Sequence, residues 1–175
     1  MISLNDLLVI VPELYLTAAA CLVLLFDVFV KDEQRDATHW MAIILLLVAI
    51  FTVIQGQPPQ TVTAFGGMFV RDHMAEILKV TVLIATILMF VMARPWLKDR
   101  QLFIGEFYSL SIFSVLGVML LVSEGSLITV YLGLELFSLP AFALVALNRE
   151  SKLSSEAAVK FFVLGALASG LLLFG

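Results

Sequence analysis

Residues 126–147 read SLITVYLGLELFSLPAFALVAL, and Glu135 is the only charged residue among them. An α-helix rises about 1.5 Å per residue, so a segment of this length crosses the ~30 Å hydrocarbon core of a bilayer. Glu135 would then lie roughly 13 Å inside, close to the middle of that core. The stretch predicts a membrane-spanning helix with a carboxyl group near its centre.

The rest of the chain repeats this pattern. Hydrophobic residues make up 62% of the 175 positions and charged residues only 14%, below the share usual in soluble domains. With about 20 apolar residues for each span, we expect six membrane helices, at about 7–30, 39–55, 73–93, 106–123, 126–147 and 155–175. The connection over 56–72, rich in Gly and Pro, is expected to be an irregular surface loop. The sequence therefore predicts an all-α, polytopic integral membrane protein without a soluble domain.

The basic residues predict the orientation of this protein in its membrane. The first, third and fifth connections contain Lys31, Arg35, Arg94, Lys98, Arg100, Arg149 and Lys152, whereas the opposite side has only Arg71. Because cytoplasmic loops carry an excess of Lys and Arg, we expect these three connections inside and the N-terminus outside. The first span is too long for a signal-peptide core and should be retained. This bias favours a bacterial plasma (inner) membrane, with the mitochondrial inner membrane as the alternative.

Several charged residues within the spans have a structural explanation. Lys79 has Glu76 three residues before it, and Asp27 has Lys31 four residues after it, so both can pair on their own helix faces. Glu13 lies near the outer end of the first span, where its carboxylate is expected to reach water. We expect structural roles for these residues.

Glu135 differs because no cation stands three or four residues from it in either direction. A charged carboxylate near mid-membrane costs at least ~2.5 kcal/mol on insertion scales. Two explanations remain. Glu135 is a neutral structural group that is hydrogen-bonded between helices, or it is a site for protons or ions, the common role of ionisable residues within membranes. Tyr131 and Ser138 share its helix face and could hold water beside it, and Pro140 cannot donate to the carbonyl of Leu136. We expect Glu135 to be functional, with Tyr131, Ser138 and Pro140 in support.

Lys160 lies about five residues inside the last span, and Glu156 is four residues before it. That pairing alone could account for the lysine, since oppositely charged residues at this spacing are neighbours on a helix. Spacing therefore leaves both a structural and a functional role open for Lys160.

Other kinds of site have no sequence support. The chain contains no glycine-rich nucleotide loop and a single cysteine, Cys21, which is expected to be a small buried residue, so neither NADH nor an iron–sulfur cluster has a site here. His39 and His73 stand at helix starts without a second ligand at metal spacing, and we expect both at the membrane interface and no bound metal. The absence of a basic patch excludes nucleic acid as a partner.

The run YLGLELFSLPAFALVALNRESKLSSEAAVKFFVLGALASGLLLFG, residues 131–175, resembles the antiporter-like membrane subunits of respiratory complex I, the NADH:quinone oxidoreductase. A glutamate before S-L-P, followed 25 residues later by the lysine of E-A-A-V-K, is a specific combination. The segments LLVIVPELYLTAAACLVLLFD (7–27) and RDHMAEILKVTVLIATILMF (71–90) are most similar to the branch called subunit N, or subunit 2 in mitochondria.

The resemblance implies roles and an organisation. Glu135 would modulate the charge state of membrane-embedded lysines, and Lys160 would belong to the proton path. Residues 1–105 would form three leading helices and residues 106–175 the first three helices of a five-helix repeat. Family members continue much further, with an essential lysine in a broken seventh helix, so we expect this sequence to be an N-terminal fragment.

The implied function is that of a proton-translocating subunit. FMN, iron–sulfur clusters and quinone would lie in partner subunits and no cofactor on this chain, and its partners would be the other membrane subunits of complex I, the lipid bilayer and protons. Two alternatives remain: a subunit of a multisubunit cation/proton antiporter, which has no redox partner, or a membrane-arm scaffold that transports nothing.

Overall fold

The helices of the computed structural model follow the apolar segments of the sequence. The structure describes residues 4–30, 35–56, 60–100, 102 and 105–175. Among these residues, six helices are long and apolar enough to cross a membrane: α2 (Val11–Phe29), α3 (Arg35–Gln55), α4 (His73–Asp99), α5 (Gly105–Val122), α6 (Leu127–Val145) and α7 (Lys152–Phe174). The prediction of an all-α fold with six membrane helices is therefore confirmed.

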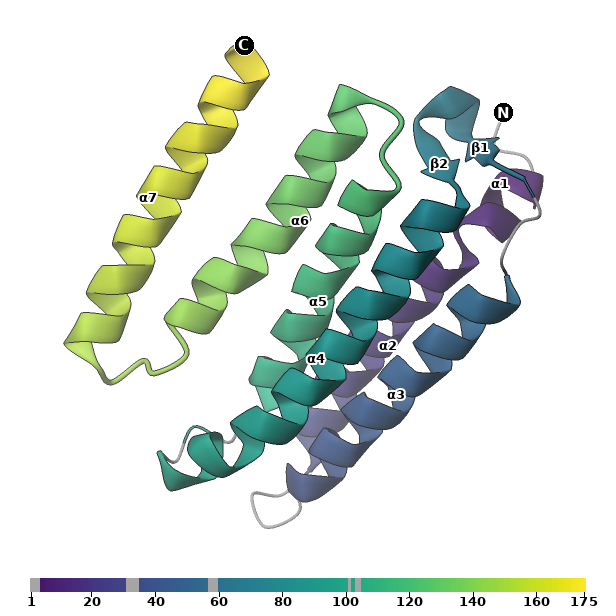
Figure 1. Ribbon diagram of the computed structural model, residues 1–175. Helices are drawn as coiled ribbons and strands as arrows, with labels where there is room; N and C mark the ends of the chain where they lie inside the picture. The colour runs from purple at the N-terminus through teal and green to yellow at the C-terminus, as the bar shows by residue number, and fades with distance from the viewer. Residues whose placement is uncertain (1–3, 31–34, 57–59, 101, 103–104) are drawn as a thin grey trace.

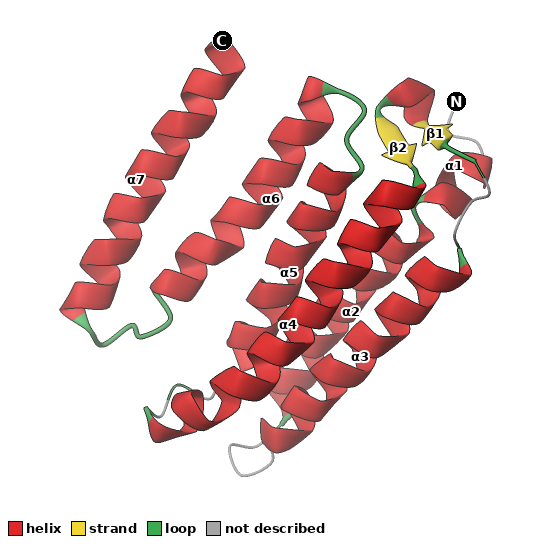
Figure 2. Cartoon of the chain, viewed as in Figure 1, coloured by secondary structure: helices red, strands yellow, loops and turns green. Residues whose placement is uncertain are grey.

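Consecutive long helices run in alternating directions beside one another, so the turns between them lie at the two ends of the helix bundle (Figure 1). α5 packs against α2, α3, α4 and α6, whereas α7 contacts α6 and stands at the edge (Figure 1). Helices account for nearly all of the ordered secondary structure (Figure 2). We call the end at which α3, α5 and α7 begin the basic end, because Arg35, Arg94, Lys98, Arg100, Arg149 and Lys152 lie there.

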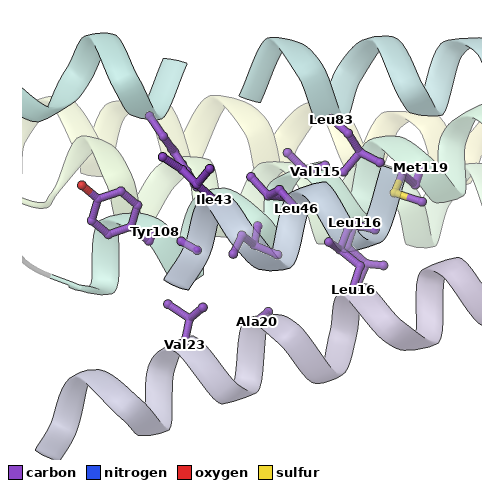
Figure 3. Packing of buried hydrophobic residues seen from close by; sticks show 14 of the residues in the cluster. Leu16, Ala20, Val23, Ile43, Leu46, Leu83, Tyr108, Val115, Leu116 and Met119 are labelled. Carbon is purple, nitrogen blue, oxygen red and sulfur yellow. The ribbon is translucent and has the colours of Figure 1, made fainter. Parts of the chain in front are cut away.

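A single hydrophobic core joins the first four membrane helices. Leu16, Ala20 and Val23 of α2 face buried side chains of α3, α4 and α5 (Figure 3). Small residues such as Ala20 and Ala42 let the helices approach closely, as is usual where no water drives helix association. α7, all of whose residues the structure describes, contributes only Ala158 to the buried set. The packed core thus lies on one side of α6, and α7 lies on the other.

The first predicted span is divided near its start. A short helix, α1 (Leu4–Val9), precedes α2, and Ile10 between them has non-helical dihedral angles of φ −97° and ψ 14°. Pro12 explains the break, since its nitrogen has no hydrogen and its ring disfavours a continuous helix through the preceding turn. One uninterrupted helix over 7–30 was therefore a wrong expectation.

The described part of the connection over 56–72, which leaves out residues 57–59, is more regular than expected. β1 (Val62–Ala64) and β2 (Phe69–Arg71) form an antiparallel hairpin, with the short 3₁₀ helix η2 (Phe65–Gly67) between them. Gly66 and Gly67 have φ values of +67° and +93°, a backbone region that glycine enters without steric cost. The hairpin also reaches the α5–α6 turn, because Val70 N donates to the Ser123 carbonyl and Gly125 N to the Met68 carbonyl, each at 2.9 Å.

The third span is longer than predicted. α4 continues through Pro95 to Asp99, although the sequence indicated a polar break after residue 93. The extension is held by Asp36 of α3, whose carboxylate lies 2.9 Å from Nη2 of Arg94 and 2.7 Å from Nζ of Lys98. Charged residues alone therefore did not mark the helix end.

Candidate functional site

α6 positions Glu135, and both its start and its packing are well defined. Ser126 caps the helix by accepting a hydrogen bond from Thr129 N at 3.3 Å, and the Thr129 hydroxyl donates to the Met68 carbonyl of the hairpin at 2.8 Å. A Cβ built on Gly117 of α5 would lie 2.3 Å from the Phe137 nitrogen of α6. The two backbones therefore touch at the level of Glu135, and this contact requires glycine.

Glu135 is half-buried near the middle of α6. Among the residues that the structure describes, no basic side chain forms an ion pair with it. A carboxylate at this depth needs a proton, water or a cation from elsewhere to offset its desolvation. The expectation that its partner comes from another helix or from water stays a prediction.

The three supporting residues do different things in the structure. Tyr131 is half-buried. Ser138 donates its hydroxyl hydrogen to backbone carbonyls of its own helix, to Leu134 at 2.7 Å and more weakly to Glu135 at 3.5 Å, rather than to the Glu135 carboxyl group. Pro140 is buried within the helix. Near this proline, Ser114 of α5 donates to the Phe137 carbonyl at 3.2 Å, an interhelical contact that the sequence did not indicate.

Lys160 forms the local pair that its spacing allowed. Its Nζ lies 2.6 Å from Oε1 of Glu156, and its side chain is 71% exposed on the outer face of α7. α7 packs on α6 mainly through aromatic contacts: Phe142 meets Phe161 edge-on at 5.1 Å between ring centroids, and Gly165 lies against the same ring. Lys160 is therefore near the Glu135 helix but takes its ion-pair partner from its own helix.

α6 packs against α7, but Glu135 and Lys160 form no ion pair with each other in the structure. An apolar cavity of about 340 Å³ lies between the two helices, lined by Leu134, Phe137, Ser138, Gly165, Ala168, Ser169 and Leu172. The hydroxyl-bearing residues Ser138 and Ser169 provide its polar groups. The cavity contains no charged side chain in its lining, so it does not itself connect the two predicted site residues.

A buried ionic network at the opposite end from the basic end was missed in the sequence. Nζ of Lys79 lies 2.7 Å from Oε1 of Glu13 in α2 and 3.6 Å from Oε1 of Glu76. Arg71 of β2 donates from Nε and Nη2 to the two carboxylate oxygens of Glu76 at 2.6 and 3.2 Å. All four residues are at most 4% exposed. The expectation that Glu13 reaches outer water is therefore wrong, because α4 and the hairpin cover it.

The same network ties the hairpin to the break between α1 and α2. Nη1 of Arg71 donates to the Val9 carbonyl at 3.1 Å, a carbonyl left without a helical partner where α1 ends. Lys79 also lies over the Phe69 ring, 5.2 Å from its centroid. The sequence did contain a signal for this network. Glu13 lies in the first turn of α2, and Glu76 and Lys79 lie in the first two turns of α4, at the same end of the bundle.

The structure also shows where Asp27, His39 and Cys21 lie. Asp27 accepts hydrogen bonds from Thr38 Oγ1 at 3.0 Å and from Gly105 N at 3.1 Å, so it caps the start of α5, while Lys31 lies outside the described residues. His39 is buried near the start of α3, with Nδ1 2.9 Å from the Tyr108 hydroxyl, and its expected place at the membrane interface stays a prediction. Cys21 is exposed on α2, contrary to the expectation of burial, because that face of the helix looks away from the core.

Comparison with known proteins identifies relatives of this chain. Residues 124–175 match the family model described as "NADH:quinone oxidoreductase/Mrp antiporter, TM". The chain is 43% identical over 173 residues to NADH-quinone oxidoreductase subunit N of Thioalkalivibrio sulfidiphilus (strain HL-EbGR7), covering 99% of this chain and 36% of that protein. It is 44% identical over 175 residues to subunit N of Herminiimonas arsenicoxydans, covering 97% and 35%. The chain thus spans about a third of the length of these relatives.

A solved structure agrees at the level of the fold. A chain of respiratory complex I from Thermus thermophilus, determined with bound aureothin, superposes with a TM-score of 0.75 at 23% identity, covering 93% of this chain and 35% of that one. The six apolar helices and the bacterial relatives indicate a multi-pass inner-membrane protein. The sequence resemblance is confirmed: over nearly its whole length the chain is similar to about a third of NADH-quinone oxidoreductase subunit N.

Proposed function

We propose that this chain is part of a proton-translocating membrane subunit of an NADH:quinone oxidoreductase. It would work as one component of a translocase, with the other membrane subunits of complex I as partners and with FMN, iron–sulfur clusters and quinone held by partner subunits. The relatives named subunit N support this assignment, and so does the family model over 124–175. The chain's own contribution would be membrane helices with ionisable groups that hold and release protons.

One observation carries the proposal: Glu135 is a half-buried carboxyl group near the middle of α6 without an ion-pair partner among the described residues. A carboxylate in a low-dielectric site interacts strongly with any cation that approaches it, since two unit charges about 5 Å apart interact by roughly 3 kcal/mol at an effective dielectric constant of 20. A nearby lysine would keep its proton while Glu135 is charged and release it more readily when that charge is removed. Glu135 is therefore assigned as the group that switches lysine protonation.

Lys160 is proposed as a proton-carrying residue of the same path. Its exposure on α7 leaves its Nζ accessible to groups other than Glu156. Within this scheme Tyr131, Ser138 and Pro140 support Glu135 by supplying hydroxyl and carbonyl oxygens along α6. We further propose that residues 1–105 form the leading helices and residues 106–175 the beginning of the repeat.

The central test replaces Glu135 in the full-length subunit. Glu135→Gln keeps size and hydrogen bonding but removes the charge, so the complex should assemble while proton translocation and the coupled quinone reduction fall several-fold. Glu135→Asp, which keeps the charge on a shorter arm, should lose less. Asp99→Asn, at an exposed position at the end of α4, is the matched control and should pump normally. Wild-type pumping by an assembled Glu135→Gln complex would contradict the assignment.

A second test separates the two roles of Lys160. If this lysine only neutralises Glu156, then the double variant Lys160→Ala/Glu156→Ala should regain the assembly and pumping that Lys160→Ala loses. If Lys160 carries protons, the double variant stays defective. We expect persistent loss of pumping, and full recovery would return Lys160 to a structural role.

One alternative has support from the family description, which includes Mrp antiporters. A cation/proton antiporter subunit would use the same buried groups without a redox partner. The relatives named NADH-quinone oxidoreductase favour the first assignment. Co-purification of the full-length subunit with NADH:quinone reductase activity distinguishes the two, and unchanged proton transfer in Glu135→Gln would instead support a scaffold.

The orientation is also proposed. Six described basic residues of the connections lie together at the basic end of the bundle. The positive-inside rule places such a concentration of Lys and Arg in the cytoplasm. The N-terminus would then lie outside, on the same side as the hairpin.

A further inference from the structure

A polar cavity opens at the basic end, apart from Glu135 and Lys160. It has a volume of about 570 Å³ and lies where α3 and α5 begin and where α6 ends. Its polar lining consists of Arg35, Arg100, Asn148, Arg149, Glu106 and Glu150. Among the described lining residues, three arginines against two glutamates leave one net positive charge, which favours an anionic ligand.

Two of these arginines keep hydrogen-bond donors available to a ligand. Arg149 touches Glu106 only at 3.4 Å, longer than a strong charge-assisted bond, and its side chain is 80% exposed. The guanidinium carbon of Arg100 lies 5.0 Å from the centroid of the Trp96 ring, a cation–π contact that uses no N–H group in a hydrogen bond. A planar guanidinium edge suits the paired oxygens of a phosphate group.

An apolar chamber adjoins the polar one. It has a volume of about 240 Å³ and shares Arg100, Leu102, Leu147 and Asn148 with the first cavity. Its remaining lining includes Trp96, Phe107 and Val145, of which Trp96 is largely exposed at the helix surface. Tryptophan is enriched where a membrane meets water. The site therefore has a charged part and an apolar part joined at the level where the membrane helices end.

We propose that this double cavity binds an anionic phospholipid, with its phosphate group in the arginine-lined part and the start of an acyl chain in the apolar part. A free phosphate ion would fit the arginines but would leave the apolar chamber without a role. Basic pockets between membrane helices on the cytoplasmic side are suited to anionic headgroups. The inference does not depend on the proposed proton path, because it uses none of its residues.

The test uses the assembled complex with a photoreactive phosphatidylglycerol that carries a diazirine on its acyl chain. After irradiation, mass spectrometry should find the label on peptides that line the apolar chamber, around Trp96 and Val145. Unlabelled phosphatidylglycerol should compete with the label, whereas phosphatidylcholine should compete poorly. Label elsewhere only, or equal competition by phosphatidylcholine, would overturn the site.

Variants test the arginines. Each of Arg100→Gln and Arg149→Gln should raise the amount of phosphatidylglycerol needed for half-maximal competition about fivefold, the effect of one basic residue near a charged membrane surface. Lys152→Gln removes a charge from the same end but outside the cavity lining, and it should leave competition unchanged. Size-exclusion chromatography confirms that each variant complex is assembled.

Two outcomes of these experiments would reject the lipid. Equal loss in Lys152→Gln would mean that only the overall charge of this end matters. Competition by inorganic phosphate at millimolar concentration, without any effect of phosphatidylglycerol, would identify a free-anion site instead. Because pumping is not the readout, failure here leaves the test of Glu135 untouched.

Discussion

Replacing Lys79 by Met gives the sharpest test of how this bundle is held together. Lys79 is the central cation of the buried network, with Nζ 2.7 Å from Glu13 and 3.6 Å from Glu76. Met is similar in length and can keep contact with the Phe69 ring, so the change removes charge with little loss of volume. Arg71 continues to hold Glu76 through two hydrogen bonds, but Glu13 is left without a cation.

The magnitude follows from these distances. At an effective dielectric constant of 20, the two contacts correspond to attractions of about 6 and 5 kcal/mol. Desolvation of the charges offsets most of that gain, and removal of one partner from a buried pair typically costs about 3–5 kcal/mol. We expect Lys79→Met to lower the free energy of unfolding by about 3–5 kcal/mol. The double variant Glu13→Leu/Lys79→Met should recover at least half of this loss, because no unpaired charge remains buried.

The assay is the unfolding equilibrium of the full-length subunit in detergent, followed by steric trapping, with assembly of the complex as a second readout. Lys98→Met is the matched control, since Lys98 is 43% exposed in its pair with Asp36 and a surface pair contributes about 0–1 kcal/mol. The reasoning is refuted if Lys79→Met costs no more than Lys98→Met. Simple additivity in the double variant would also refute it, because Glu13 and Lys79 would then not interact.

Two other predictions concern packing and orientation. Gly117→Ala should cost about 1–3 kcal/mol of stability, because the new methyl group would meet the α6 backbone, whereas Gly170→Ala, with nothing within 4 Å, should be neutral in the same unfolding assay. In a Cys21→Ser background, cysteines introduced at Lys98 and Lys152 should resist an impermeant thiol reagent applied from outside. Labelling of both in intact cells would reverse the proposed topology.

The apolar helices and the place of Glu135 near the middle of one of them were predictable from the sequence. Hydropathy and the length of an apolar segment are local properties, and the rise of a helix converts position within the segment into depth. The family resemblance was predictable too, because the spacing between Glu135 and Lys160 can be read from the sequence alone. The pair between Lys160 and Glu156 followed from the same helical geometry.

Other local features were less predictable. Pro12 follows the end of α1, whereas Pro95 lies inside α4 without ending it, where Asp36 of the neighbouring helix pairs with Arg94 before the proline and Lys98 after it. A proline weakens a helix, but contacts with other helices decide whether the helix stops. The hairpin was equally hard to predict, since two of its backbone hydrogen bonds join it to the distant α5–α6 turn.

The sequence by itself determined that this protein has six apolar helices able to cross a membrane, where along those helices its charges lie, and which family it resembles. Only the tertiary structure decided which groups meet: Glu13 with Lys79, Ser114 with the Phe137 carbonyl, and Gly117 with the α6 backbone. The physical reason is that lipid chains are as apolar as leucine, so a membrane helix is hydrophobic on every face and its pattern does not reveal which face packs. The rotation of each helix about its own axis is instead set by small residues that allow close contact and by buried polar groups, whose hydrogen-bond or ion-pair partners lie on other helices.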